Sequence, residues 1–343
     1  MTKKVTMKDI AREAGVSVMT VSYVLNNTKN QTISEATRKK VLKTAESLQY
    51  VPNAAAKSLR TSHASCIGVV AGQNISQRRL AAALEGIRRT LEHNGYDMLL
   101  TSGRAKEGEL PAYVDEFVRN RIDGVLYISH DGIPIPENEK ALLSHWNIPA
   151  AALDADVGET GFPAVEFDYY HSAAEHTAHL IEKKITDFLY VRPNCDTVQE
   201  REREAGIRNA LLRHPEDSLV VLTVPSGDLE KQQEDLDLAS FFRGKLAAAL
   251  QSLPDHSAVI CSWGIYMEYV YAAVLASGKM IWTAGLARGG LSESVWENLS
   301  YNVMPDDEAG ARCAMLLLTY LKDHTAKREI VLPKYVESLR SSF

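Results

Sequence analysis

Beyond residue 65 the sequence alternates between short apolar segments and longer amphipathic ones, and this alternation restricts the fold more than any other feature. Segments of four or five mainly apolar residues, such as 67–70 and 124–128, are typical of buried strands. Segment 80–93, which lies between them, carries apolar residues at helical spacing. Strands that are apolar throughout and alternate with helices predict parallel sheets covered by helices on both faces.

The series is long enough for two such doubly wound sheets in tandem. We expect strands at 67–70, 96–101, 124–128, 150–153, 165–167, 188–191, 219–224, 258–261 and 280–284. We expect helices at 80–93, 110–120, 172–182, 202–212 and 266–276. Because ligands of such folds bind at the carboxyl ends of the strands, binding residues are expected there.

Residues 6–48 instead predict three short helices. Thr6, Ser17 and Ser34 can each cap a helix that begins at the next residue, and Gly15 allows a tight turn between the first two. The first two helices are expected at 7–14 and 18–25. Two short helices joined by a glycine-containing turn predict a helix-turn-helix, whose second helix can enter the major groove of DNA.

The charge distribution separates the two parts. The whole chain has a net charge of −6, which argues weakly against DNA binding. Residues 1–60 hold eleven Lys or Arg and four Asp or Glu, a balance of +7, so the remaining 283 residues carry −13. A short basic segment on an acidic body is expected where one small domain contacts phosphates. Judged by charge alone, a basic N-terminal tail that binds no partner is as good an interpretation as a DNA-binding domain.

The N-terminal residues contain two motifs that occur together. The first reads VTMKDIAREAGVS over 5–17, followed by TVS at 20–22 and VLN at 24–26. The second reads Y-x-P-N-x-x-A-x-x-L over 50–59. Together they closely resemble the LacI/GalR (lactose repressor) family. The resemblance extends thinly through the body, at Ile67-Gly68-Val69, Asp123-Gly124, Ile148-Pro149 with Asp154, Arg203 with Gly206, and Gly278.

The resemblance implies which residues contact DNA. Val18 and Met19 would occupy the main base-reading positions. Asn53 would begin a hinge helix, from which Ala56 and Leu59 would enter the minor groove, with Leu59 wedged between the central base pairs. Without the motif around it, Leu59 would be an ordinary linker residue. Hydroxyl and amide groups near the groove wall would contact phosphates or position the helix: Thr6, Ser17, Thr20, Ser22 and Asn26.

Tyr23 departs from the family, in which this position is very often Arg. Tyrosine cannot donate a bidentate pair to guanine, but it can contact a thymine methyl group or a phosphate. With Val18 and Met19 beside it, the second helix has an apolar reading edge. We therefore expect thymine methyl contacts in the half-sites.

For the body, the resemblance implies the architecture of periplasmic sugar-binding proteins, in which ligand lies between two subdomains. The expected division is a helix-turn-helix domain at 1–49, a hinge helix and linker at 50–64, and an effector-binding and dimerisation domain at 65–343. The first subdomain would comprise 65–163 and 292–325, and the second 164–291 and 326–343. The chain would cross between them near residues 163, 291 and 326.

Family members contact ligand at strand ends and adjoining loops, where this chain has Asp154, Phe167, Asp168 and Arg203. Arg203, at the start of an expected helix, can form paired hydrogen bonds with hydroxyls or an anion. The alternative interpretation of Arg203 is an exposed charge in an alternating run.

Two departures argue against the usual sugar effector. Trp263-Gly264 stands where many relatives have Asn-Asp, and Gly285-Leu286-Ala287 followed by Arg288 stands where many have Gly-Tyr/Phe-Asp. A Trp face and an Arg would suit an anionic or phosphorylated effector, with Arg104 and Arg192 as further charges. Alternatively, the pocket is degenerate and a protein corepressor docks on the body.

Other constellations do not indicate catalysis or a metal site. His176 and His179 could share a helix face, but no carboxylate stands at metal-site spacing, so a surface helix is favoured. The glycine-rich segment 285–290 lacks the spacing of a phosphate loop, and no G-x-S-x-G elbow occurs. The four cysteines form no C-x-x-C pair, which argues against zinc and disulfides. We expect no enzyme activity, metal or cofactor.

We therefore expect a sequence-specific repressor that binds a pseudo-palindromic operator as a homodimer, with a small-molecule effector controlling hinge order. The alternative from another functional class is a ligand-binding protein or an enzyme whose helical N-terminal segment does not bind DNA. No apolar run of membrane-spanning length and no signal peptide is evident, so we expect a bacterial cytoplasmic, nucleoid-associated protein without a membrane partner.

Overall fold

The computed structural model describes residues 5–26, 32–50, 63–71, 78–101, 109–129, 133–158, 161–225, 238–294, 296–325 and 327–339. The chain divides into two compact units, residues 1–64 and 65–343, called the head and the body below. Within the described ranges, no helix combines the length and apolar character needed to cross a membrane.

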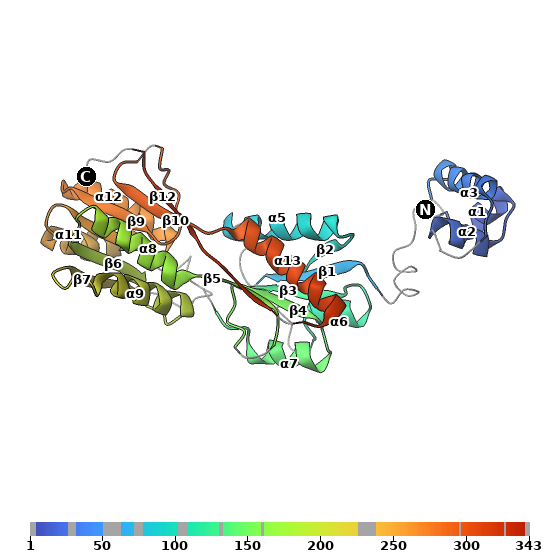
Figure 1. Cartoon of the computed structure of the whole chain (residues 1–343), viewed down its shortest axis with the longest axis horizontal. Coiled ribbons are helices and arrows are strands. Elements are labelled where there is room, and N and C mark those ends of the chain that lie inside the picture. The colour runs from blue at the N-terminus through green and yellow to red at the C-terminus, as the bar shows by residue number, and fades with distance from the viewer. Residues whose placement is uncertain are drawn as a thin grey trace. The chain divides into compact units, whose positions relative to one another are not determined.

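The described part of the head consists of helices α1 (Met7–Ala14), α2 (Val18–Leu25) and α3 (Glu35–Ser47) (Figure 1). Gly15 ends α1 in the left-handed region, at φ 65°, which glycine adopts without a steric penalty. Helices of eight residues are unstable alone, so a shared core has to hold them. That core contains Ile10, Ala11, Ala14, Val21, Val24, Val41 and Ala45.

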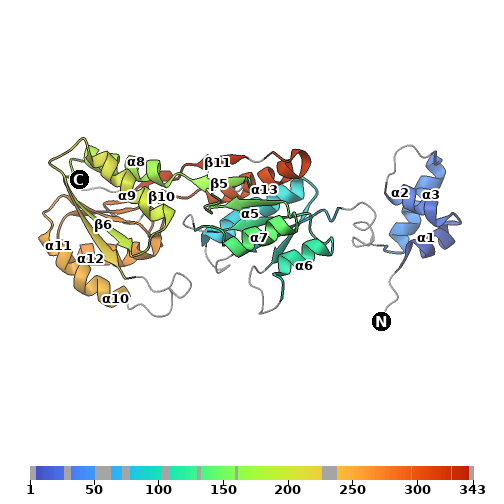
Figure 2. The ribbon, with the colours of Figure 1, turned by 90° about the horizontal axis from the view of Figure 1, so that it is seen from below.

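The first sheet of the body is parallel, with the strand order β11-β5-β4-β3-β1-β2. Its strands are β1 (Cys66–Ala71), β2 (Asp97–Thr101), β3 (Gly124–Ile128), β4 (Ala150–Leu153), β5 (Ala164–Phe167) and β11 (Arg328–Val331). One face packs against α5 (Arg78–His93) and α13 (Asp306–Asp323), and the other against α6 (Ala112–Val118) and α7 (Glu137–His145) (Figure 2).

The second sheet has the order β12-β10-β9-β8-β6-β7. Its strands are β6 (Asp187–Pro193), β7 (Ser218–Val224), β8 (Ser257–Cys261), β9 (Ile281–Gly285), β10 (Leu299–Val303) and β12 (Lys334–Glu337). One face packs against α8 (Tyr169–Glu182) and α9 (Val198–Leu211). The other packs against a segment with α10 (Leu238–Phe241), the π-helical turn η1 (Phe242–Leu246), α11 (Ala247–Ser252), the 3-10 turn η2 (Gly264–Tyr266) and α12 (Met267–Ser277).

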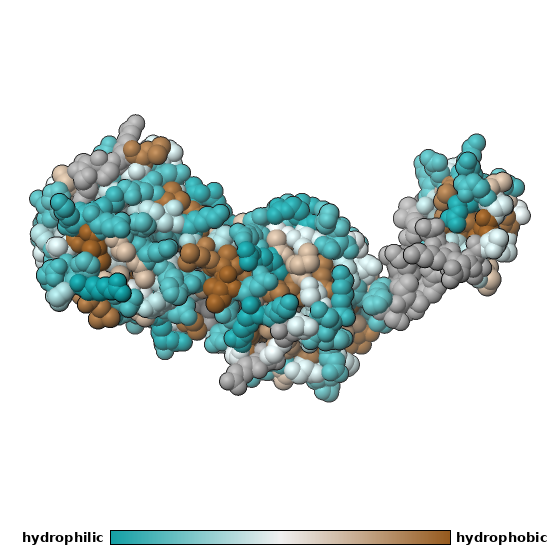
Figure 3. Space-filling model, in the orientation of Figure 1, coloured by the Kyte–Doolittle hydropathy of each residue, from teal (hydrophilic) through white to brown (hydrophobic). Residues whose placement is uncertain are grey.

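The apolar side chains form clusters on both faces of each sheet, which explains why the strands are apolar throughout. The face of the molecule in Figure 3 is accordingly mostly hydrophilic, with hydrophobic groups in separate patches. The expected fold class, a small helical head and a two-sheet α/β body, is confirmed. One strand departs from the expected parallel sheets, because β12 is antiparallel to β10.

The sheets exchange strands at other places than the sequence predicts. Strands β5 and β11 pair with each other in the first sheet, although the sequence interpretation placed both in the second subdomain. Strand β10 lies in the second sheet, although residues 292–325 were expected in the first subdomain. The chain crosses after β5, between β10 and α13, and between β11 and β12. Strands of four or five residues carry no local signal for the sheet that they join, because their partners are distant in sequence.

Helices α5 and α13 approach each other closely at two glycines. A Cβ atom on Gly86 would overlap the carbonyl oxygen of Asp307, and one on Gly310 would overlap that of Ala83. The two backbones can touch only because neither position carries a side chain. This contact brings the first turns of both helices to the same end of the first sheet.

We expect Gly310→Ala to lower the free energy of unfolding of the body by about 1–3 kcal/mol, because the two helices must separate to accept the methyl group. Urea unfolding followed by circular dichroism measures this. Gly244→Ala is the control, since a Cβ at Gly244 meets no atom within 4 Å. A loss in Gly310→Ala no larger than in Gly244→Ala would contradict the close contact.

Candidate functional site

The position of α2 in the head is determined by its cap and its buried side. The hydroxyl of Ser17 accepts a hydrogen bond from the backbone N–H of Thr20 at 3.0 Å, and the two hydroxyls lie 2.9 Å apart. Val21 and Val24 are buried in the head core. The first turn of α2 is therefore held with its opposite side directed outward.

That outward side carries apolar side chains. Val18 is 42% exposed and Met19 is 64% exposed. Exposed apolar surface costs free energy in water, and contact with a thymine methyl group would remove that cost. Tyr23, one turn further along α2 from Met19, is half-buried. The structure thus presents the two expected base-reading residues together at the start of one helix.

The remaining expected DNA contacts are polar groups at helix ends. Thr6 precedes α1, and its hydroxyl and backbone N–H donate to the Asp9 carboxylate at 2.7 and 3.0 Å. Asn26 ends α2, and its Nδ2 donates to the Ser22 carbonyl at 2.6 Å. Ser17 and Thr20 belong to the α2 cap described above. The predicted hinge residues Asn53, Ala56 and Leu59 lie outside the described residues.

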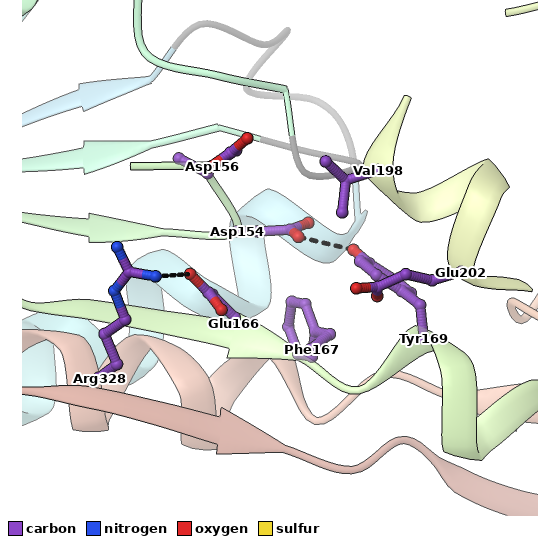
Figure 4. Close-up of a pocket in the computed structure, with 9 residues that line it drawn as sticks. Asp154, Asp156, Glu166, Phe167, Tyr169, Val198, Glu202 and Arg328 are labelled. Atoms are coloured by element: carbon purple, nitrogen blue, oxygen red, sulfur yellow. Dashed lines mark hydrogen bonds and ion pairs between the residues drawn. The ribbon is translucent and has the colours of Figure 1, made fainter. Parts of the chain in front are cut away.

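The body contains a cavity of about 180 Å³ where the two sheets meet (Figure 4). Its walls come from the segment after β4, from β5 and β11, and from the first turns of α8 and α9. Its lining residues are Asp154, Ala155, Asp156, Glu166, Phe167, Tyr169, Val198, Glu202 and Arg328. Asp154 and Asp156 follow the carboxyl end of β4 and Phe167 ends β5, as expected for this fold, whereas Arg328 is the first residue of β11.

A hydrogen bond joins the two sides of the cavity, because the Tyr169 hydroxyl donates to Asp154 Oδ1 at 2.6 Å. Arg79, at the start of α5, places Nη2 3.4 Å from Asp154 Oδ2 and Nε 3.1 Å from Asp306 Oδ1. The Arg79 guanidinium also lies 5.3 Å from the centroid of the Phe167 ring. The negative charge of Asp154 is thus balanced within the wall itself.

Negative charge predominates in the rest of the lining. The described lining contains the carboxylates of Asp156, Glu166 and Glu202 and one guanidinium, that of Arg328, which lies 3.9 Å from the Glu166 carboxylate. Burial raises the pKa of both Glu166 and Glu202, and nearby carboxylates raise the pKa of each further. This lining does not support the anionic effector expected from the sequence, since an anion would be repelled.

Arg203 is 1% exposed and does not line the cavity. Its Nη1 donates to the Ser262 carbonyl at 2.8 Å, and its Nη2 donates to the Leu286 carbonyl at 2.9 Å. Arg203 therefore ties α9 to the ends of β8 and β9. The alternative interpretation of Arg203 as an exposed helix charge is wrong, because it shares a helix face with the buried Gly206 and Ile207.

The buried carboxylate of Glu200 accompanies Arg203. It accepts a hydrogen bond from Trp263 Nε1 at 3.0 Å and one from the Ser262 hydroxyl. Arg203 Nη1 lies 3.9 Å from this carboxylate, and Arg192 Nε lies 3.8 Å from it. A buried charge is tolerated only with such partners. Trp263 and Arg192 are thus part of a buried network in the half of the body that is built around the second sheet, called the second half below.

Two more expected effector residues lie outside the cavity lining. Asp168 caps α8, where its carboxylate accepts a hydrogen bond from the His171 backbone N–H at 2.9 Å. The Arg288 guanidinium lies 5.6 Å from the centroid of the Tyr301 ring. Of the six expected effector residues, only Asp154 and Phe167 line the cavity described here.

Sequence reasoning missed several lining residues: Asp156, Glu166, Tyr169, Val198, Glu202 and Arg328. Asp156 could have been found, because it directly follows the strand end that carries Asp154. Arg328 was missed because β11 was assigned to the other half of the body. Helical spacing could have separated Glu202 from Arg203, since neighbouring residues on a helix face different directions.

The expectation of a surface position for both histidines of α8 is wrong for His176, which is buried. Its Nδ1 lies 3.0 Å from Asn302 Oδ1 and its Nε2 lies 2.7 Å from Ser300 Oγ. Burial lowers the pKa of His176 to about 3, so the ring is neutral. Among the described residues, no three His, Cys, Asp or Glu side chains are placed to hold a metal ion.

Comparison with known proteins gives consistent results. The model of the family described as "Bacterial regulatory proteins, lacI family" matches residues 6–53. Catabolite control protein A of Staphylococcus aureus (strain MRSA252) is 27% identical over 337 residues, which cover 97% of this chain and 98% of that protein. Catabolite control protein A of Staphylococcus xylosus is 29% identical over 212 residues, 61% of this chain and 62% of that protein.

Solved structures share the fold. The lac repressor dimer bound to operator and the anti-inducer ONPF superposes with a TM-score of 0.78, at 19% identity and 98% coverage of both chains. The transcriptional regulator CelR in complex with cellobiose superposes with a TM-score of 0.64, at 20% identity, with 97% of this chain and 98% of that chain covered.

We expect Arg203→Met to lower the free energy of unfolding by about 3 kcal/mol, because Glu200 would lose a neighbouring cation while staying buried. Arg208→Met on the same helix is the matched control, since the Arg208 side chain is 55% exposed. That control should change stability by less than about 0.5 kcal/mol. Denaturant unfolding of both variants tests this, and equal effects would mean that the buried network does not stabilise the fold.

Burial raises the pKa of Asp306 from 3.8 to about 6, against the opposing effect of Arg79. Protonated Asp306 therefore stabilises the folded chain below about pH 4, and this contribution is lost as the pH rises through 6. In Asp306→Asn the side chain cannot ionise, so this variant lacks the pH-dependent loss of the parent chain. Its free energy of unfolding, taken relative to that of the parent, should therefore rise by about 3 kcal/mol between pH 4 and 7. Urea unfolding across this range measures the difference. Asp323→Asn, exposed at the end of the same helix, should show no such trend.

Proposed function

Because this chain belongs to the LacI family of bacterial regulatory proteins and is a DNA-binding transcriptional regulator rather than an enzyme, we propose that it represses transcription as a homodimer on a pseudo-palindromic operator. The observation that carries the proposal is the outward, apolar first turn of α2 on a compact helical head. The lac repressor in the comparison is a dimer bound to operator, which supports the proposed assembly. Two-fold symmetry of the protein would be matched in the DNA.

Base reading is assigned to Val18 and Met19, with Tyr23 as a third contact. Apolar side chains distinguish thymine by its methyl group, so this helix should favour T at the contacted positions. The hydroxyls and amide of Thr6, Ser17, Thr20, Ser22 and Asn26 would contact phosphates or position the helix.

The hinge assignment follows from the family motif at 50–59. Asn53 would begin the hinge helix, and Ala56 and Leu59 would enter the minor groove. Inserting Leu59 between base pairs costs a few kcal/mol of unstacking, which the wider contact with bent DNA would offset. We assign this action to the bacterial cytoplasm, at the nucleoid.

A small-molecule effector would bind in the cavity between the sheets and favour one of two arrangements of the body. The cavity touches both sides of the Tyr169–Asp154 hydrogen bond, so its occupant can act on the contact between the two halves. Two of the structural relatives contain small molecules, an anti-inducer in one and cellobiose in the other, which supports this assignment.

Selection of duplexes from a random pool by the full chain should return a pseudo-palindrome with T-rich half-sites. Met19→Ala should weaken binding to the selected duplex by roughly tenfold, because a methyl contact is lost, and leave salt-dependent binding to unrelated duplexes unchanged. Fluorescence anisotropy measures both affinities.

Leu42→Ala is the control for this experiment, because Leu42 is an equally apolar side chain, 48% exposed on α3. It should leave both affinities unchanged. Recovery of duplexes without any common sequence would reject operator binding, and G-rich half-sites would reject the apolar reading edge.

A further inference from the structure

We propose that the effector of the cavity between the two sheets carries a protonated amine, which the carboxylates of Glu202, Glu166 and Asp156 accept. The inference rests on the proposed function, which makes the cavity an effector site, and adds the chemical class of the effector. It replaces the anionic or phosphorylated ligand that Trp263 and Arg288 suggested from the sequence alone.

Among the described residues, three arginines near the cavity are directed at other partners, whereas Arg328 lines the cavity and lies 3.9 Å from Glu166. Arg79 lies between Asp154 and Asp306, as described above. Arg192 places Nη1 2.5 Å from Glu204 and Nη2 2.8 Å from the carbonyl of Cys195. Arg203 donates to two backbone carbonyls in the second half of the body. These guanidinium groups therefore do not supply the positive charge that an anionic ligand would need.

Glu202 is the clearest acceptor for a cationic ligand. It is half-buried in the cavity wall, and the adjacent Arg201 pairs with Asp196 at 2.7 Å instead. Burial raises the pKa of Glu202, and the carboxylates of Asp168 and Glu166 raise it further. A bound ammonium group would relieve this repulsion, whereas a bound anion would increase it.

The helices that begin at the cavity do not reverse this preference. A helix N-terminus can bind an anion through free N–H groups. At α8, however, the Asp168 carboxylate accepts the His171 N–H. At α9, the Thr197 hydroxyl accepts the Glu200 N–H at 3.3 Å. A side chain of the protein thus already accepts one N–H at the start of each helix.

The carboxylates are spread along the cavity wall rather than gathered at one point (Figure 4). In the described ranges, no three acidic, histidine or cysteine side chains are close enough to coordinate a metal ion. A metal ion needs several oxygen ligands at a single centre. An organic cation with several N–H or O–H donors fits the observed spacing better.

The aromatic side chains give the cavity an apolar surface beside its charges. The rings of Phe167 and Tyr169 have centroids 6.1 Å apart, and both line the cavity. Arg79 lies over the Phe167 ring and Arg203 over the Tyr169 ring, so the aromatic surface that faces the cavity is suited to packing against the C–H groups of a ring or chain. The cavity volume of about 180 Å³ restricts the occupant to a small molecule.

Calorimetric titration of the full chain with matched probes tests the proposal. Glucosamine and galactosamine are compared with glucose and galactose, spermidine and putrescine are compared with butanediol, and glucose-6-phosphate serves as the anion. At least one amine should bind roughly tenfold or more tightly than its neutral counterpart, and its binding should weaken as salt is added. The two amine series distinguish a hydroxylated amine from a polyamine. Tighter binding of any neutral or phosphorylated probe than of every amine, or no binding of any amine, overturns the proposal.

Charge-removing variants locate the binding amine. Glu202→Gln and Asp156→Asn should each weaken it by roughly tenfold, because a charge-assisted hydrogen bond is lost. Asp156 is exposed, so its replacement should not disturb folding. Glu175→Gln, at an exposed position on α8, is the matched control and should bind as the parent does. Unchanged affinity in both cavity variants overturns the assignment.

Duplex selection in parallel separates this inference from the proposed function. If the chain selects a common duplex sequence but binds no amine, the effector class is wrong and operator binding stands. If an amine binds in the cavity but no duplex is selected, operator binding is wrong and the cavity chemistry stands.

Discussion

The hydrogen bond between Tyr169 and Asp154 connects the start of α8 with the end of β4, two elements that line the cavity. Strand β5 ends at Phe167 and α8 begins at Tyr169, so the chain passes from the first sheet to a helix packed on the second sheet within one residue. Asp154 lies opposite this passage, in the left-handed region at φ 53°, and Arg79 balances its charge. An occupant of the cavity would touch both ends of the hydrogen bond. Binding of the proposed effector would therefore involve the same atoms as the contact between the two halves, which is the physical requirement for a ligand to favour one arrangement of the body.

Some charged side chains of helix α9 are buried in the second half of the body, and another faces the cavity. Glu200 and Arg203 face inward and satisfy each other together with Ser262 and Trp263. Glu202 lies between them in sequence but faces the cavity. The inward pair is a structural network that joins α9 to the ends of β8 and β9. The second half of the body thus keeps its guanidinium groups for its own stability and presents a carboxylate to the cavity.

The head is stabilised by helix capping and a small apolar core, unlike the body with its two sheets. Its helices are too short to be stable alone, so the capping hydroxyl of Ser17 and a core of small side chains hold them together. The same arrangement leaves Val18 and Met19 exposed. A stable small core and an outward apolar edge are compatible because the two sets of residues lie on opposite sides of α2.

The sequence by itself determined the class of each part, because the features involved are local. The Gly15 turn, the Ser17 cap and the exposed start of α2 depend on residues within two turns of one another. Apolar strands alternating with helices indicated a doubly wound body for the same reason. Only the tertiary structure decided that β5 and β11 pair in the first sheet, that His176 is buried against β10, and that Glu202 rather than Arg203 lines the cavity. Sheet membership, burial and the balance of charge depend on partners far apart in the chain, and a local pattern does not contain that information.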